Sequence, residues 1–253
     1  MKRLIGIIQF MTRIPIPIDT GFDEEFHKSM IYFPIVGFIL GICYTLVAKL
    51  GLTLFNPYIA AVLVLASEVI LTGGLHLDGL GDSFDGLYSY RDKERILEIM
   101  KDSRLGTNGL LAILIVLLLK VGFIYTLLDQ NILWPILTMP VVARSMQVLA
   151  CYGARTPREK GMGNIFIGKV SISYLIGAIM LMLGINLVSI YLMSGQVMYI
   201  EESVTVLIIA AGVKLFIKTV YQKIDGITGD ILGCICELSE LAYLLMIYIM
   251  VRF

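Results

Sequence analysis

Charged side chains are scarce in this sequence of 253 residues, where Asp, Glu, Lys and Arg together make up 16%. Soluble globular proteins carry about 25% of these residues, so the shortage argues against an ordinary soluble enzyme. The 20 acidic and 20 basic residues leave no net charge, and no overall positive field therefore directs the chain to nucleic acid. Apolar residues make up 58%, which also excludes an intrinsically disordered chain.

Paired CxxC motifs are absent as well. The four cysteines all lie within apolar stretches, at Cys43, Cys151, Cys234 and Cys236. Free cysteines in such surroundings are typically small buried apolar groups, so we predict no zinc site. The first 30 residues contain no apolar run followed by small residues suited to cleavage, and we expect no secretory signal peptide.

Long apolar stretches dominate the rest of the chain. Each has about the 20 residues that a helix needs to cross the bilayer core. The stretches lie approximately at 31–50, 57–75, 109–128, 132–151, 170–193, 203–220 and 231–251. We therefore predict an all-α fold, a polytopic integral membrane helix bundle of about seven transmembrane helices, formed by 1–253 as a single domain.

The basic residues of the polar segments are distributed unevenly. They fall in alternate segments of the chain, at 1–30, 76–108, 152–169 and 221–230. The intervening segments carry only acidic charges, from Asp129, Glu201 and Glu202. Basic segments of membrane proteins remain in the cytoplasm, so we predict a cytoplasmic N-terminus and an external C-terminus. The segment 76–108 is the main cytoplasmic region in which we expect an active site.

Three carboxylates occupy the start of that segment. Asp78, Asp82 and Asp85 are spaced by four and three residues, which places them on one face of a helix. Carboxylates so close repel one another unless a cation lies between them. Oxygen ligands suit Mg²⁺, Mn²⁺ or Ca²⁺ rather than zinc, and Mg²⁺ commonly shares its ligands with phosphates. The spacing therefore predicts a metal site for a phosphate-bearing substrate, with a solvated acidic helix end as the ordinary alternative.

Other residues near this cluster are less decisive. The interleaved glycines, Gly79, Gly81 and Gly86, favour close approach of a ligand. Glu68 lies inside an apolar stretch, where a charge is costly and indicates function. A helix break at Gly73-Gly74 would let Glu68 join the metal ligands, whereas a straight helix would keep it about 15 Å from Asp78. Two interpretations of His76 are equally good. It is either a neutral side chain that forms a hydrogen bond with the backbone or a residue that acts on the substrate.

Two glycine-bearing basic segments are candidates for phosphate binding. The segment 101–109 contains Lys101, Asp102 and Arg104 and leads into an apolar stretch. Cations and backbone N–H groups at a helix N-terminus form an anion site, with Arg offering a planar fork, although ordinary flanking of a membrane helix by basic residues explains this segment equally well. Arg155 belongs to a second such segment, for which ordinary flanking of a membrane helix is the stronger interpretation. Arg144 lies within a predicted span and needs an anionic partner.

A second acidic group begins the last apolar stretch. Asp225 and Asp230 precede Glu237 and Glu240. Asp230 and Glu237 are seven residues apart and share a helix face, whereas Glu240 is offset by about 60°. These acids approach from the same side as the first cluster. They either complete a metal site or bind amide or amine groups of a substrate, so Asp225, Asp230 and Glu237 join Asp102, Arg144 and Arg155 as substrate-binding candidates.

Together these motifs resemble the cobalamin synthase family, the integral-membrane adenosylcobinamide-GDP ribazoletransferases. The matching features are Phe10-Met-Thr-Arg-Ile-Pro-Ile-Pro17, Tyr32-Phe-Pro-Ile-Val-Gly37, the acidic run 76–86 with the loop 100–106, and 226–230 with Glu237 and Glu240. The resemblance covers nearly the whole chain, and the acidic run with its following loop is its specific part. One departure is Gly81, where the pattern leads us to expect a residue such as alanine.

The resemblance implies a Mg²⁺-dependent phosphotransferase of a prokaryotic cytoplasmic membrane. It would join adenosylcobinamide-GDP to α-ribazole or its 5′-phosphate, release GMP and form adenosylcobalamin or its 5′-phosphate. Such chemistry depends on positioning and charge neutralisation, with one group accepting the hydroxyl proton. The catalytic candidates are His76, Asp82, Asp85, Lys101 and Arg104. The metal candidates are Glu68, Asp78, Asp82 and Asp85. A homo-oligomer and association with pathway enzymes at the membrane are further expectations from the resemblance.

Two alternative functions share some of these features. A CDP-alcohol phosphatidyltransferase also uses aspartates spaced by four on a membrane helix. Its motif has Ala-Arg after Asp-Gly-x-x, whereas Gly81-Asp82 stands here. A cation-coupled transporter could instead use the intramembrane charges Glu68, Lys120, Arg144 and Lys214.

Overall fold

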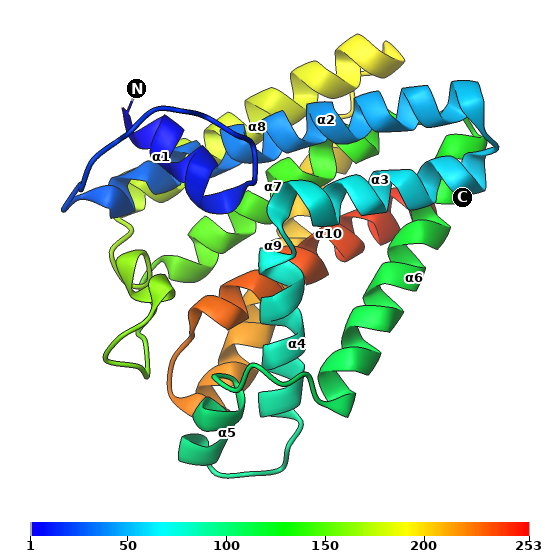
Figure 1. The fold of residues 1–253 in the computed structure, drawn as a ribbon. Coiled ribbons are helices and arrows are strands. Elements are labelled where there is room, and N and C mark those ends of the chain that lie inside the picture. The colour runs from blue at the N-terminus through cyan, green and yellow to red at the C-terminus, as the bar shows by residue number, and fades with distance from the viewer. Residues whose placement is uncertain (1, 253) are drawn as a thin grey trace.

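The computed structural model describes residues 2–252, and every regular element in that range is a helix (Figure 1). The α-helices are α1 (Lys2–Met11), α2 (Phe33–Leu54), α3 (Pro57–Thr72), α4 (Leu75–Leu87), α5 (Lys93–Ile99), α6 (Thr107–Asp129), α7 (Trp134–Cys151), α8 (Ile172–Ser194), α9 (Tyr199–Ile224) and α10 (Gly229–Arg252). Two short 3₁₀ helices, η1 (Phe26–Tyr32) and η2 (Met162–Ile165), complete the described chain. The all-α prediction is confirmed.

The number of membrane spans is lower than the seven predicted. Among the described residues, five helical segments are long and apolar enough to cross a bilayer, and α3 with α4 makes a sixth if this bent pair is one span. The five are η1 with α2, α6, α8, α9 and α10. The predicted span at 132–151 corresponds to α7, which does not qualify. Its side chains are nearly all buried by protein, so this helix lies in the core of the bundle and does not contact lipid.

Helix α7 lies at the centre of the bundle. It packs against α2, α8, α9 and α10, and Figure 1 shows it enclosed by them. The outer helices α6, α8 and α9 bury a smaller share of their most apolar segments than α2 and α10 do. Rows of exposed leucine and isoleucine on these outer helices therefore form the surface that faces lipid. The cysteines are free, and Cys151, Cys234 and Cys236 are buried as predicted.

The chain turns by 90° between α3 and α4. Gly73 and Gly74 adopt left-handed backbone conformations with φ of 64° and 71°, which glycine tolerates without a steric cost. The N–H of Arg13 donates to the carbonyl of Leu71 at 2.6 Å, and the Arg13 side chain packs so closely that a Cβ at Gly73 would collide with it. The helix break considered from the sequence is therefore present, and it sends α4 between α6 and α10.

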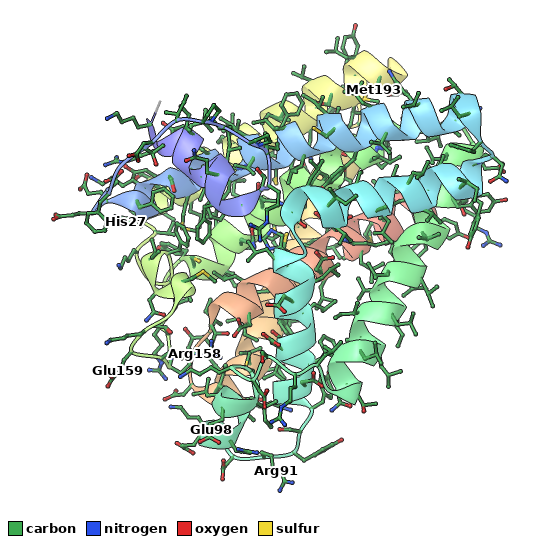
Figure 2. All side chains as sticks on the ribbon, viewed as in Figure 1. His27, Arg91, Glu98, Arg158, Glu159 and Met193 are labelled. Atoms are coloured by element: carbon green, nitrogen blue, oxygen red, sulfur yellow. The ribbon has the colours of Figure 1, made fainter. Side chains whose placement is uncertain are left out.

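The basic segments come together at one end of the bundle, as the alternation of charges predicted. Lys93 of α5 lies 3.5 Å from Asp225 after α9, and Arg155 pairs with the same carboxylate. The rings of Phe10 and Phe166 meet with centroids 5.5 Å apart, which joins the N-terminal segment to the loop after α7. Figure 2 shows charged side chains such as Arg91, Glu98 and Arg158 at this end. We call it the charged end.

Acidic residues near the opposite end are not all on the surface. Glu202, an expected loop residue, is 1% exposed in the first turn of α9. It accepts hydrogen bonds from Asn186 at 2.6 Å and from the Tyr243 hydroxyl at 2.8 Å. The Tyr243 hydroxyl also lies 2.9 Å from that of Thr138. This polar chain ties α7, α8, α9 and α10 together, so Glu202 has a packing role.

Candidate active site

Carboxylates from two helices meet at the charged end. Asp78 and Asp82 lie one turn apart on α4, and Asp230 stands in the first turn of α10. Asp82 is half-buried and within electrostatic range of Asp78, Asp85 and Asp230. We call Asp78, Asp82 and Asp230 the acidic group. The sequence-based idea that Asp230 approaches the first acidic cluster is realised in this arrangement.

Glycines allow α4 and α10 to come so close. A Cβ added to Gly79 would lie 2.7 Å from the carbonyl oxygen of Asp230, and one added to Gly233 would lie 3.1 Å from that of His76. The distance at Gly79 is shorter than any ordinary Cβ contact, so this position requires glycine, whereas a Cβ at Gly233 would need the backbone of α4 to move by a few tenths of an ångström. The close crossing sets the spacing between Asp230 and the carboxylates of α4.

The glycines of the acidic run serve helix packing, and Gly79 also lines a cavity between these helices, so the close approach of a ligand stays a prediction there. Gly79 faces the backbone of α10, and Gly81 faces apolar side chains that include Ile113 of α6. Gly86 leaves room for the side chain of Met100. Gly81 and Gly86 therefore lie between α4 and a neighbouring helix or loop.

Asp85 has a role that its spacing did not predict. One carboxylate oxygen accepts the N–H of Gly106 at 2.7 Å, and the other accepts the N–H of Gly109 at 2.8 Å. These N–H groups belong to the start of α6, where backbone donors have no partner within the helix. Asp85, which belongs to α4, therefore caps the neighbouring helix α6 and holds the loop 101–106 against α4. Each oxygen keeps one further lone pair, so the caps leave metal ligation or proton transfer open as proposals.

An Asp85→Ala substitution should destabilise the protein through this cap. Loss of a side-chain cap costs about 0.5–2 kcal/mol, which corresponds to a fall in melting temperature of about 1–8 °C for a chain of this size. Thermal unfolding in detergent measures the change. Asp92→Ala, which removes the cap of the short surface helix α5, is the matched control and should have a smaller effect. Equal melting temperatures for wild type and Asp85→Ala would contradict the capping role.

The basic residues of the loop before α6 lie on the surface. Arg104 pairs with Asp102 at 2.6 Å, and its hydrogen bonds lower the pKa of Asp102 to about 2. Lys101 is exposed, and none of the ion pairs within residues 2–252 involves it. An incoming phosphate would find Lys101 free, but it would have to displace the Asp102 carboxylate from Arg104.

Arg155 and Asp225, both predicted to bind substrate, bind each other. Their ion pair and the hydrogen bond from Arg155 lower the pKa of Asp225. The Arg155 guanidinium also lies over the ring of Tyr221, 5.6 Å from its centroid. These contacts join the loop after α7 to the end of α9. The pair therefore stabilises the arrangement of these two segments at the charged end.

A second set of charges is buried inside the bundle. The Lys120 ammonium donates to Glu68 at 2.6 Å, to Glu237 at 2.7 Å and to Glu240 at 2.5 Å. Arg144 pairs with the other oxygen of Glu240. All five side chains are at most 4% exposed. We call these five residues the buried network, in which four helices are joined through their charged groups.

The buried network takes in three residues that the sequence assigned to the site. Glu68 was expected beside the aspartates of α4, and Arg144 and Glu237 were expected to bind substrate. The helix does break after Glu68, but Lys120 draws its carboxylate into the bundle. The structure therefore does not bring these three side chains to the acidic group.

Metal ligation was considered for both sets of carboxylates. In the described part of the chain, Glu68, Glu237 and Glu240 are the group whose ligand atoms lie within 4.8 Å of one another. Lys120 already donates to all three, so its ammonium occupies the place of a cation. The aspartates of α4 share one face but do not reach that mutual distance. In the described chain, no lysine or arginine pairs with these aspartates of α4. Their carboxylates are therefore free to bind a metal ion from solution.

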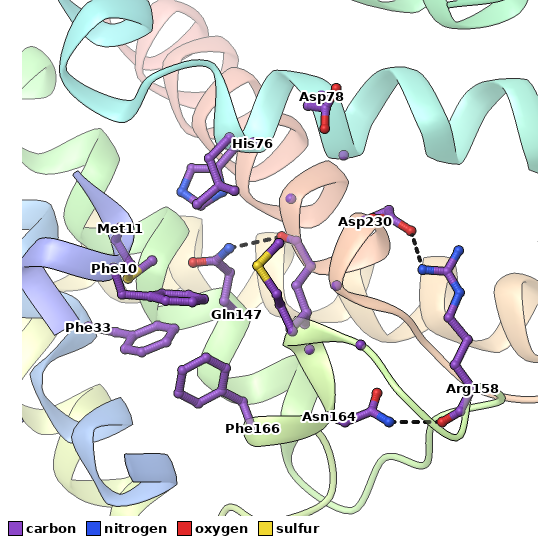
Figure 3. Close-up of a pocket in the computed structure, with 18 residues that line it drawn as sticks. Phe10, Met11, Phe33, His76, Asp78, Gln147, Arg158, Asn164, Phe166 and Asp230 are labelled. Carbon is purple, nitrogen blue, oxygen red and sulfur yellow. Dashed lines mark hydrogen bonds and ion pairs between the residues drawn. The ribbon is translucent and has the colours of Figure 1, made fainter. Parts of the chain in front are cut away.

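A cavity of about 180 Å³ opens beside the acidic group (Figure 3). Phe10, Phe33 and Phe166 form much of its wall, and Asp78 and Asp230 line it too. The sequence pointed to none of these aromatic residues as part of a site. The only signal was that Phe10 and Phe33 belong to the two N-terminal motifs that carried the family resemblance.

Arg158 is a further residue that sequence reasoning missed. It pairs with Asp230 at 2.9 Å and lines the cavity. Its side chain is only 12% exposed, unlike that of a residue that merely flanks a membrane helix. Arg158 belongs to the basic segment after α7, whose cations were interpreted mainly as flanking charges, and its burial beside a carboxylate could be seen only in three dimensions.

These observations define a polytopic helical membrane protein with a charged site and a cavity at one end of its bundle. Residues 3–248 match the family model CobS, described as cobalamin-5-phosphate synthase, and the chain belongs to this family. A curated relative from Clostridioides difficile, named adenosylcobinamide-GDP ribazoletransferase, is 53% identical over 99% of this chain and 98% of its own length. A relative of the same name from Alkaliphilus metalliredigens is 47% identical over 98% and 95%.

A third relative with this name, from Fusobacterium nucleatum, is 36% identical over 100% of this chain and 99% of its own length. No solved structure matches the chain. The family resemblance seen in the sequence motifs is thus confirmed over the full length. Family membership favours the enzyme over the lipid phosphotransferase and the transporter considered as alternatives.

Proposed function

We propose that this chain catalyses the reaction for which its relatives are named. The adenosylcobinamide phosphate group of adenosylcobinamide-GDP is transferred to α-ribazole or its 5′-phosphate, GMP is released, and adenosylcobalamin or its 5′-phosphate is formed. This is the last stage in assembly of the cobalamin nucleotide loop. The observation that carries the proposal is the acidic group beside Arg158 and a cavity, in a chain of this family.

The acidic group fits a divalent cation such as Mg²⁺. It offers carboxylate oxygens, the ligands that Mg²⁺ prefers, and of its three members only Asp230 has an ion-pair partner in the described chain. Asp78 and Asp82 would hold the ion, with Asp230 beside them. When bound, the ion would neutralise charge on the diphosphate of the donor. Asp85 would remain mainly a cap for α6, since both of its oxygens are engaged.

The reaction is a displacement at phosphorus. A ribose hydroxyl of the acceptor forms a bond to the phosphorus that carries the cobinamide group, and the bond from that phosphorus to the oxygen of GMP breaks. Asp82 is half-buried among other carboxylates. It would accept the hydroxyl proton through the oxygen that does not hold the ion, since a carboxylate can act as a general base. His76 is the alternative base, because it lines the cavity beside the acidic group.

Cationic side chains surround the acidic group and would bind phosphate oxygens. Arg158 donates through one nitrogen to Asp230, while its Nε and Nη2 atoms are buried and have no hydrogen-bond partner in the described chain. Charge-assisted bonds from these atoms would position a phosphate. Lys101 and Arg104 would stabilise negative charge that develops on the departing GMP. Asp102 would orient Arg104 until the nucleotide binds.

The same proposal places the charged end in the cytoplasm. The basic segments of this end lie together in the structure, and basic segments of membrane proteins are retained on the cytoplasmic side. Nucleotide substrates would then reach the acidic group from the cytoplasm, while α6, α8 and α9 contact the lipid bilayer.

Purified protein in detergent should release GMP from adenosylcobinamide-GDP only when α-ribazole and Mg²⁺ are both present. One GMP should appear for each corrinoid product, as measured by chromatography. Chelation of divalent ions with EDTA should lower the rate to background, and added Mg²⁺ should restore it. GMP release that is equal without α-ribazole would indicate a hydrolase, and product formation in EDTA would contradict the metal assignment.

A further inference from the structure

The cavity beside the acidic group has an aromatic interior. Phe166 lines it and contacts two other phenylalanines, with its ring 5.5 Å from that of Phe10 and 5.6 Å from that of Phe33. The interplanar angles are 68° and 77°, so the rings meet edge to face. The three phenylalanines come from α1, from the start of α2 and from the loop after η2. The fold therefore gathers aromatic side chains from distant segments around one open space.

Two buried polar atoms in the cavity wall have no partner. The Nε2 atom of His76 and the Oε1 atom of Gln147 make no hydrogen bond with any described residue. These side chains are 4% and 3% exposed. Gln147 is held in place by its Nε2, which donates to the carbonyl of Leu232 at 3.0 Å. Buried polar atoms are nearly always hydrogen-bonded, so the pair indicates a ligand with a few polar atoms.

The mouth of the cavity is the proposed catalytic centre. Asp78, Asp230 and Arg158 line the same cavity as the phenylalanines, and Figure 3 shows the Asp230–Arg158 pair on the side away from Phe10 and Phe33. A ligand with an aromatic portion in the interior would thus present its remaining atoms to the acidic group.

We propose that this cavity binds the aromatic base of the acceptor nucleoside and directs its ribose hydroxyl toward the acidic group, of which Asp78 and Asp230 line the cavity. The inference rests on the function proposed above, and it assigns the acceptor to a particular place in the fold. Phe10, Phe33 and Phe166 enclose the base. His76 and Gln147 face its polar edge, and Arg158 lies where a 5′-phosphate on the acceptor would enter.

The size and the chemistry of the cavity exclude the other parts of the two substrates. An apolar cavity of about 150 Å³ holds one benzene ring, so 180 Å³ admits a single small aromatic base but not a corrin macrocycle. Guanine presents several strong donors and acceptors along its edges. Beside the phenylalanines, away from Arg158 and the aspartates, the described cavity wall offers the unpartnered atoms of His76 and Gln147. A weakly polar aromatic base fits this wall better than the guanine of the donor does.

Equilibrium binding without turnover tests the proposal. Kd is measured in detergent for α-ribazole and, separately, for GDP as a probe of the donor nucleotide. Phe33→Leu keeps an apolar side chain but removes the ring, and stacking of a base on an aromatic ring contributes enough that Kd for α-ribazole should rise about 5- to 100-fold. Kd for GDP should change less than about twofold. Phe10→Leu, at a half-buried position, should give the same pattern.

Phe26→Leu is the matched control, because Phe26 contacts Phe166 at 5.8 Å but does not line the cavity. It should leave both Kd values unchanged. Unaltered α-ribazole binding in folded Phe33→Leu and Phe10→Leu, or a selective loss of GDP binding, would overturn the inference while leaving the proposed function intact. Wild-type protein that binds neither α-ribazole nor its 5′-phosphate would overturn the proposed function itself.

A measurement on the wild-type protein does not depend on whether the variants fold. A photoreactive azido derivative of α-ribazole, substituted on its base, should label the segments that contain Phe10, Phe33 and Phe166, as identified by mass spectrometry of peptides. Excess α-ribazole should prevent the labelling, and excess GDP should not. Specific labelling confined to other segments would overturn the assignment.

Discussion

Asp82→Asn should lower the rate of ribazole transfer by at least about 10²- to 10³-fold, the effect of removing one group that stabilises charge in a transition state. Asp82 lies between Asp78 and Asp85 on α4 and near Asp230. The amide has the same shape as the carboxylate, so the change removes one negative charge and a proton acceptor. GMP release at several Mg²⁺ concentrations measures the rate, and the variant should also require more Mg²⁺.

The folded structure should tolerate this substitution. Within residues 2–252, no hydrogen bond or ion pair holds the Asp82 carboxylate, in contrast to Asp85. The melting temperature and the Kd for α-ribazole should therefore stay close to wild type. Asp129→Asn removes the same charge from an exposed position at the far end of α6 and should leave the rate unchanged. Wild-type turnover and Mg²⁺ dependence in Asp82→Asn would remove Asp82 from the proposed mechanism.

Features with a local cause could be predicted from the sequence. The spacing of Asp78 and Asp82 fixed their common face as soon as α4 was a helix. Two consecutive glycines at 73 and 74 are poor helix formers, and the helix does end there. The alternation of basic segments likewise predicted that they meet at one end, because consecutive membrane helices run in opposite directions.

Features that depend on partners distant in the chain could not be predicted. Lys120 lies 52 residues from Glu68 and 117 from Glu237, and no local pattern shows that these groups meet. Asp85 fits a metal ligand by its spacing, yet its oxygens are taken by two N–H groups of α6. The central place of α7, where other helices surround it, could not be predicted either, because hydropathy does not distinguish a helix surrounded by protein from one surrounded by lipid.

The two sets of charges also differ in a way that separates packing from chemistry. In the buried network, each of the three glutamates has a cation within hydrogen-bond distance. In the acidic group, Arg158 pairs with Asp230 alone in the described chain, and Asp78 and Asp82 lie near the protein surface with no cation. A complete set of partners is typical of a structural role, whereas carboxylates left without partners beside a cavity indicate a place for substrate and metal.

Lys120→Met should destabilise the protein strongly. It removes the ammonium that contacts Glu68, Glu237 and Glu240 while keeping an apolar stem of similar length. Removal of one partner from a buried ion pair costs about 3–5 kcal/mol because the remaining charge stays uncompensated. For a chain of this size, the melting temperature in detergent should fall by about 6–20 °C.

Two further variants decide whether the loss arises from the buried network. Lys218→Met removes an exposed lysine from α9 and should leave the melting temperature nearly unchanged, because an exposed charge contributes little to stability. Adding Glu68→Gln and Glu237→Gln to Lys120→Met removes the uncompensated carboxylates, so much of the lost stability should return. Since buried ion pairs can be replaced by neutral groups with little net cost, this recovery would locate the effect in charge compensation. A melting temperature for Lys120→Met equal to that of wild type would instead show that the glutamates do not need the lysine.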